Sequence, residues 1–90
     1  MTNSLMEQFL TMCLNQASQA QSVEQVNTFQ DTAFGAIMYS CMLLEQSNEE
    51  LPPEFCELNN FFKENLLAEW QNWYVPLFSA IKECVKEQER

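Results

Sequence analysis

The chain has 90 residues, 47% of them hydrophobic, and its 13 acidic and 4 basic side chains give a net charge of −9. This length suits a single domain over residues 1–90. The first basic residue is Lys63, so the clustered cations that neutralise phosphates are missing, which argues against direct nucleic-acid binding and against an anionic membrane surface. One glycine and three prolines leave few turn signals, so the composition favours helices over an all-β fold.

The first periodic segment covers residues 5–20. Its apolar side chains recur at three- and four-residue steps: Met6, Phe9, Leu10, Cys13, Ala17 and Ala20. This spacing predicts an amphipathic helix. Ser22 followed by Gln25 is a capping signature, in which the hydroxyl accepts a hydrogen bond from a free backbone N–H at a helix start. It predicts a second helix over residues 23–46.

The middle of this second helix, residues 33–44, carries no charge, and at helical spacing its apolar side chains point in every direction. Such a helix must be covered on most sides. Twelve residues are too few to cross a bilayer, which needs about 20. We therefore expect residues 23–46 to form a central helix covered by the flanking segments. Gly35 within it suggests either the close approach of another helix or a kink.

The last third of the chain follows a loop over residues 47–53. Pro53 suits the first turn of a third helix, where its missing N–H costs nothing. Four large side chains form one apolar face: Phe55, Leu58, Phe61 and Phe62. After Leu66 this face rotates by roughly a third of a turn, judged at 100° per residue. The new stripe contains Leu66, Trp70, Trp73, Tyr74, Leu77, Ile81 and Cys84.

Pro76 lies inside this stripe, where it removes a backbone donor and crowds the preceding turn. The pattern therefore predicts a third helix over 53–74 and a fourth over 76–88, or one kinked helix. The expected fold class is all-α, a small antiparallel helical bundle of three to four helices around the central apolar helix at about 23–46.

The sequence offers little for catalysis. It has no histidine, which rules out Ser-His-Asp triads and Cys-His pairs. The cysteines are 28, 15 and 28 residues apart, without the close pairs of structural zinc sites: Cys13, Cys41, Cys56 and Cys84. We expect no enzymatic activity, no cofactor and no metal, with the cysteines as buried free thiols. No secretory leader is visible at the start, so the expected localisation is cytoplasmic.

Two sets of residues are candidates for partner binding. One is an acidic cluster on either side of the loop: Glu45, Glu49, Glu50, Glu54 and Glu57. It could engage a basic partner, or it could be solvated surface with carboxylates placed favourably at a helix start. The other is an aromatic group that contains Trp70, Trp73, Tyr74 and Phe78, of which the first three are the candidate binding residues. Such side chains anchor interfaces, but in a small chain they also fill cores.

These observations predict a non-catalytic protein-binding module. Its most economical role is a small acidic inhibitor or regulator that occupies a basic, nucleic-acid-handling surface of a larger protein, as phage or mobile-element inhibitors do. The alternative is a structural or assembly protein, or a chaperone, acting as an obligate helical oligomer. Ninety residues barely cover this much apolar surface, so we also expect a homodimer or a permanent partner.

Overall fold

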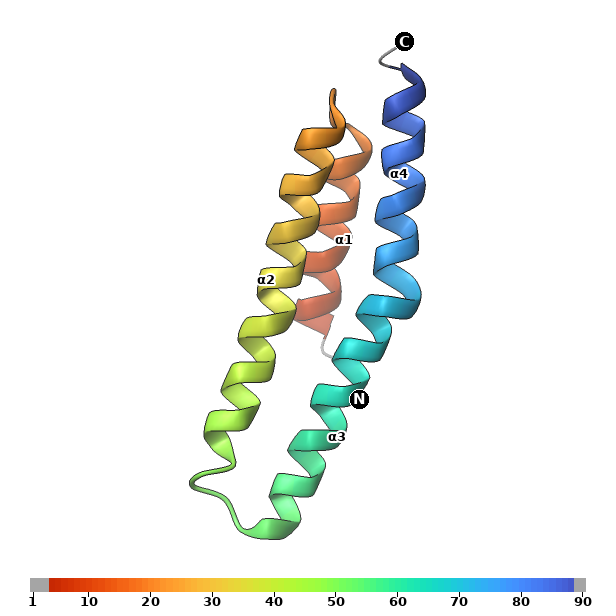
Figure 1. Ribbon diagram of the computed structural model, residues 1–90. Helices are drawn as coiled ribbons and strands as arrows, with labels where there is room; N and C mark the ends of the chain where they lie inside the picture. The colour runs from red at the N-terminus through yellow and green to blue at the C-terminus, as the bar shows by residue number, and fades with distance from the viewer. Residues whose placement is uncertain (1–3, 89–90) are drawn as a thin grey trace.

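The computed structural model describes residues 4–88, and this part of the chain is helical throughout apart from two short connections. The helices are α1 (Ser4–Ser18), α2 (Val23–Ser47), α3 (Pro53–Glu69), the π-helical turn η1 (Trp70–Tyr74) and α4 (Val75–Gln88). α3, η1 and α4 form one continuous rod that runs antiparallel to α2, and α1 packs against both arms of this hairpin (Figure 1). The expected all-α antiparallel bundle is confirmed.

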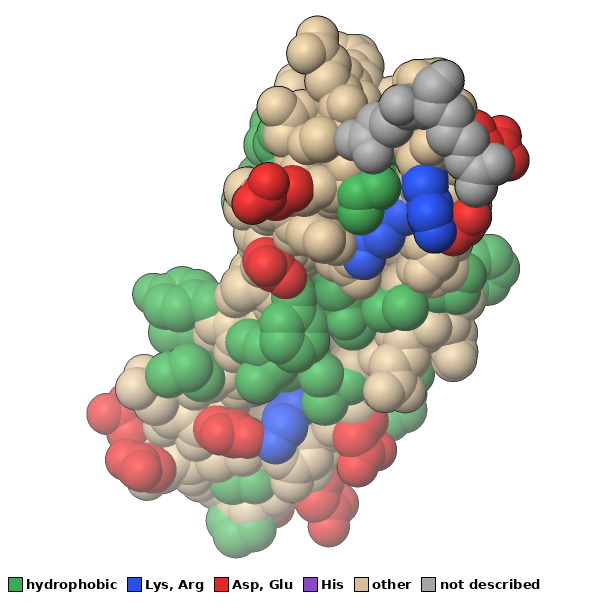
Figure 2. Space-filling model, turned by 45° about the horizontal axis from the view of Figure 1, so that its top comes forward, with side chains coloured by type: hydrophobic (Ala, Val, Ile, Leu, Met, Phe, Trp, Pro, Cys, Tyr) green, Lys and Arg blue, Asp and Glu red, His purple; other side chains and the backbone are tan. Residues whose placement is uncertain are grey.

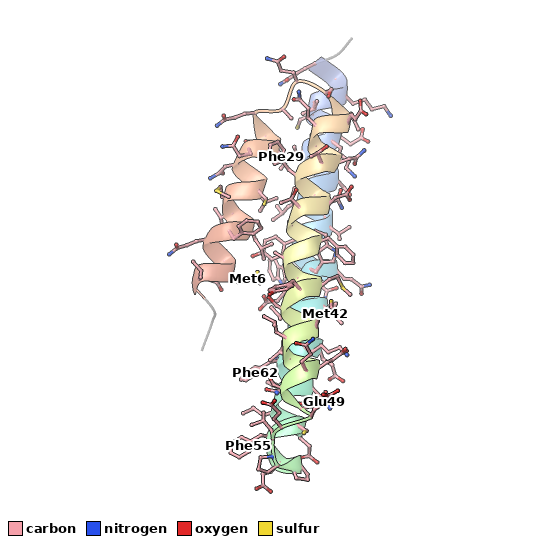
Figure 3. The ribbon with its side chains drawn as sticks, turned by 90° about the vertical axis from the view of Figure 1, so that its left-hand side faces the viewer. Met6, Phe29, Met42, Glu49, Phe55 and Phe62 are labelled. Atoms are coloured by element: carbon pink, nitrogen blue, oxygen red, sulfur yellow. The ribbon has the colours of Figure 1, made fainter. Side chains whose placement is uncertain are left out.

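The hairpin is much longer than the helix that covers it. The molecule extends 56 Å along its longest axis. α1 has 15 residues and therefore spans only about 22 Å at 1.5 Å per residue. It lies beside α4 and beside α2 to just short of Met42, and it leaves most of α3 and the last turns of α2 without a third helix (Figures 1 and 3). We refer to these two regions as the three-helix end and the two-helix end.

The core lies in the three-helix end and reaches the middle of the molecule. It contains Leu10, Cys13, Ala17, Ala20, Val26, Ala33, Ile37, Cys41, Trp70, Phe78 and Val85. The Trp70 ring links the α2 and α4 sides of the core. Its centroid lies 5.4 Å from that of the Phe34 ring on α2 and 6.0 Å from that of the Phe78 ring on α4. Tyr74 stacks on the same indole with centroids 6.2 Å apart. Aromatic pairs at such distances stabilise a core beyond the area they bury.

The cap predicted at the start of α2 is confirmed. Ser22 is extended, and its Oγ accepts a hydrogen bond from the backbone N–H of Gln25 at 3.2 Å. The Gln25 side chain in turn accepts from the backbone N–H of Gln21 at 2.9 Å, one residue earlier than in a regular capping box. These bonds satisfy free donors of the tight connection and so fix α2 antiparallel to α1.

Pro76 neither breaks nor ends the rod, because the chain changes its helical hydrogen bonding just before it. In η1 the backbone N–H of Val75 donates to Trp70 O, five residues back. A π turn inserts one extra residue into an α-helix. This insertion moves the apolar stripe by one position, so Phe78 and Val85 are buried while Trp73, Leu77 and Cys84 are exposed. The predicted stripe was wrong at these three exposed positions.

α2 is central, since it contacts α1, α3 and α4, but it is not covered on most sides as its sequence suggested. Only four of its side chains are buried, whereas Met38, Tyr39 and Met42 are exposed. The reason is geometric, because three short neighbours cannot enclose a helix of 25 residues. The close approach suggested at Gly35 was also wrong, since nothing lies within 4 Å of the position of a Cβ there.

The cysteines agree only partly with the expectation of buried free thiols. All four are free, and Cys13 and Cys41 are buried, but Cys56 is half-buried and Cys84 is exposed. Burial raises the pKa of the Cys13 and Cys41 thiols. Burial also raises the pKa of Tyr74, and the nearby Glu69 and Glu7 carboxylates raise it further.

These raised pKa values predict a loss of stability at alkaline pH. The folded state holds the three protons to a higher pH than the unfolded chain does, so the free energy of unfolding falls once the pH exceeds the ordinary thiol value of 9.0. Urea unfolding followed by circular dichroism at pH 7, 9 and 10.5 measures this decline. The double variant Cys13→Ala, Cys41→Ala should show a shallower decline. An identical pH profile in both proteins would contradict the assignment to these thiols.

Candidate partner-binding surface

The five carboxylates of the acidic cluster gather at the tip of the two-helix end, and all are exposed. Glu45 lies in the last turns of α2, Glu49 follows α2 in the connection, and Glu54 lies in the first turn of α3. Glu49 points to the side opposite α1 (Figure 3). Glu45 forms an ion pair with Lys63, whose Nζ donates a hydrogen bond to Glu45 Oε1. This hydrogen bond raises the pKa of Lys63.

The three aromatic candidates do not form a patch. Trp70 is 6% exposed and belongs to the core, where Tyr74, half-buried, stacks on it. Trp73, at 68% exposure, points away from both. Two of these side chains therefore serve the fold, and Trp73 alone offers its ring to another molecule.

A row of exposed apolar side chains lies on α3, where the sequence pattern predicts one apolar face. No side chain of α3 is fully buried. Phe55, Leu58 and Phe62 are each between 43% and 49% exposed. Side chains that bury this little contribute only part of the free energy that a core position supplies.

Polar contacts hold the two arms together at the tip. Asn59 Nδ2 donates to Asn48 Oδ1 at 3.0 Å and to the carbonyl of Leu44 at 3.4 Å. The Cys56 thiol donates to the carbonyl of Asn48 at 3.3 Å. Partly exposed hydrogen bonds of this kind each contribute about 1 kcal/mol net. They fix the register of α3 on α2 but cover none of the aromatic rings.

The exposed rings of α3 point to the side of the hairpin on which α1 lies. Figure 3 shows Phe55 and Phe62 on this side, below the start of α1. Phe29, near the start of α2, packs against the core on the same side of α2. Positions 7, 11 and 14 residues after Phe29 share its face of the helix. The first two of these positions, Ala36 and Ser40, are half-buried, whereas Leu43 is exposed. We call the surface formed by Leu43, Phe55, Leu58 and Phe62 the open face.

The side of the molecule away from α1 also carries apolar side chains. Figure 2 shows them as a band across the middle, with carboxylates above and below it. Phe34, Met38 and Met42 are between 40% and 54% exposed. Phe34 already packs against Trp70, and a shallow hollow beside it is lined in part by Leu67. Part of the apolar surface on this side is therefore covered within the chain itself.

The open face is bordered by negative charge. Glu54 lies four residues before Leu58, and Glu69 lies seven residues after Phe62, so both carboxylates share the α3 side of the face. The Glu69 and Glu7 carboxylates both raise the pKa of Tyr74. Among the described lysines, Lys63 is paired with Glu45, and the other two belong to α4 in the three-helix end. Nothing described on the open face balances its carboxylates.

The overall dimensions agree with an incompletely covered hairpin. The accessible surface is 6530 Å², whereas a compact chain of 10.5 kDa has roughly 5,400 Å² by the usual scaling with mass. The radius of gyration is 15.5 Å, against about 12 Å for a compact domain of this length. The excess surface follows from the elongated two-helix end.

Other kinds of site receive no support from the described residues. Within residues 4–88, no group of three or more His, Cys, Asp or Glu side chains is arranged to hold a metal ion. Among the same residues, no helix is long and apolar enough to cross a membrane. Comparison with protein-family models, curated proteins and solved structures found no significant match to this chain. Its candidate surface therefore rests on its own residues.

Two identical substitutions test whether the open face lies outside the core. Phe78 is 0% exposed and Phe62 is 43% exposed. Phe78→Ala should cost about 3–5 kcal/mol, as for a fully buried ring, and Phe62→Ala less than about 1.5 kcal/mol. Urea unfolding at low protein concentration measures both costs. Equal losses would show that Phe62 is part of the core, contrary to the structure.

Proposed function

We propose that this chain is a non-catalytic protein-binding module and that the open face is its binding surface. The observation that carries the proposal is that α3, although rich in Phe and Leu, has no fully buried side chain and leaves Phe55, Leu58 and Phe62 nearly half exposed. Soluble monomers rarely leave contiguous apolar surface uncovered, and such patches mark interaction sites. The proposed module therefore acts by contact and not by chemistry.

The leading form of this function is a small acidic inhibitor or regulator acting in the cytoplasm. The net charge of −9 would speed its encounter with a basic surface, such as that of a nucleic-acid-handling protein. The carboxylates of Glu54 and Glu69 beside the open face would then meet lysines or arginines at the rim of the contact. The apolar side chains would supply most of the affinity, as they do at the centres of interfaces.

The alternative function is structural, with a second copy of the chain covering the open face in a homodimer. The large side chains of the open face are Leu43, Phe55, Leu58 and Phe62, and Phe61, Leu51 and Tyr39 lie at its edges. Their exposed halves amount to roughly 700 Å² of accessible surface, at about 100 Å² for each side chain. A standard interface buries about 800 Å² per partner.

A pull-down with three forms of the chain tests the leading proposal. Wild type, Phe62→Asp on the open face and Met42→Asp on the opposite side are immobilised and exposed to lysate of the source cells. Met42→Asp is the matched control, since it adds the same charge at a side chain with similar exposure. We expect one basic protein to be retained by wild type and Met42→Asp and lost from Phe62→Asp.

Size-exclusion chromatography with light scattering separates the two functions. A monomer is expected for the inhibitor or regulator, and a stable dimer that Phe62→Asp dissociates is expected for the structural role. Retention of the same protein by all three forms, together with a monomer insensitive to Phe62→Asp, would refute the open face as a binding surface. Loss of binding in Met42→Asp alone would place the surface on the opposite side.

A further inference from the structure

We infer that the element received by the open face is a basic amphipathic α-helix of about 12–15 residues, seated in line with α1. The inference rests on the proposed function and specifies the chemistry of the partner. It follows from the shape of the face and from the charges along its border.

The shape is set by α1, which shows how a helix packs on this side of the hairpin. Leu10, Cys13 and Ala17 of α1 are buried at three- and four-residue steps against α2 and α4. The same side of the hairpin continues between α2 and α3 beyond the start of α1 (Figure 3). α3 has 17 residues, or about 25 Å of helix, so a partner helix of 12–15 residues and about 18–22 Å fits beside it.

The helical hairpin favours a helix over an extended strand as the element of the partner that binds the open face, which we call the guest. Every described segment that could pair with a strand is helical, so its backbone donors and acceptors are already used within α2 and α3. A helix satisfies its own backbone and needs only side-chain contacts from its host. Apolar residues of the guest at positions i, i+3, i+4 and i+7 would face Leu43, Leu58 and Phe62.

The charge of the guest follows from the carboxylates that border the face. Glu69 is the last residue of α3, at the end closest to α1, and Glu54 lies in the first turn of α3, near the tip. A second copy of this chain would bring the same carboxylates to the contact, and its Lys63 is already paired with Glu45. Lysines or arginines flanking the apolar stripe of a guest helix would instead neutralise both ends of the open face.

Synthetic peptides test the inference directly. The probe is a capped 15-residue peptide with Leu at helical spacing and Lys at the flanking positions; the controls are a Leu/Glu peptide with the same pattern and a scrambled Leu/Lys peptide. Fluorescence anisotropy of labelled peptides measures Kd at about 0.15 M salt, where purely surface charge attraction is well screened. We expect the patterned Leu/Lys peptide to bind at least about 10-fold more tightly than either control.

Variants of the chain locate the bound peptide. Phe62→Asp should weaken binding at least about 10-fold, although it adds a negative charge that would strengthen non-specific attraction of a basic peptide. Met42→Asp should change binding less than about 2-fold. Glu54→Gln with Glu69→Gln should weaken it more than Glu49→Gln with Glu50→Gln, which removes the same charge from the connection after α2.

Three results would overturn the inference. They are equal binding of the scrambled peptide, preference for the Leu/Glu peptide, and binding unaffected by Phe62→Asp. A dimer that Phe62→Asp dissociates, with no peptide binding, would show that a second copy covers the face; the inference would then fail while the open face stands as a binding surface. The chain could also be a monomer that binds no peptide but still retains a protein in the pull-down in a Phe62-dependent way. That result would reject the basic helix as the partner and leave the proposed function standing.

Discussion

The mismatch in length between α1 and the α2–α3–α4 hairpin governs the rest of this molecule. A helix of 15 residues spans less than half of a structure 56 Å long. Where α1 is present, Leu10, Cys13 and Ala17 complete a core around Phe78. Where it is absent, the hairpin has two helices, and two helices can bury only the stripe on which they face each other. The apolar side chains of α3 beside that stripe are consequently left exposed.

The π turn at η1 determines which aromatic side chains join the core. Its extra residue allows the rod to pass Pro76 without a break and turns Phe78 and Val85 toward α1 and α2. Without this insertion, the regular continuation of the helix would have buried Trp73 and Leu77 in their place. The turn thus separates two registers, one that pairs α3 with the end of α2 and one that fills the three-helix end.

The sequence predicted the helices well because helical periodicity and caps are local signals. Ser22 with Gln25 marked the start of α2, and Pro53 marked the start of α3. Burial was harder to predict, because it depends on which helix lies opposite. Phe62 and Phe78 are equally apolar in sequence, yet Phe78 is fully buried in the three-helix end and Phe62 is 43% exposed. The acidic cluster and the aromatic group were predicted as candidate sites because of their composition. The open face could not be predicted in this way, because it combines residues from two helices and no sequence pattern specifies on which side of the hairpin they lie.

Amide hydrogen exchange of the monomeric chain tests most directly whether a cooperative core exists only at the three-helix end. Exchange free energies report local opening, which is easiest where few apolar side chains are buried. If the core is confined to that end, amides of α4 around Phe78 exchange only through global unfolding, while amides of α3 around Leu58 and Phe62 exchange through smaller openings. Equal protection of α3 and α4 in the monomer would contradict it.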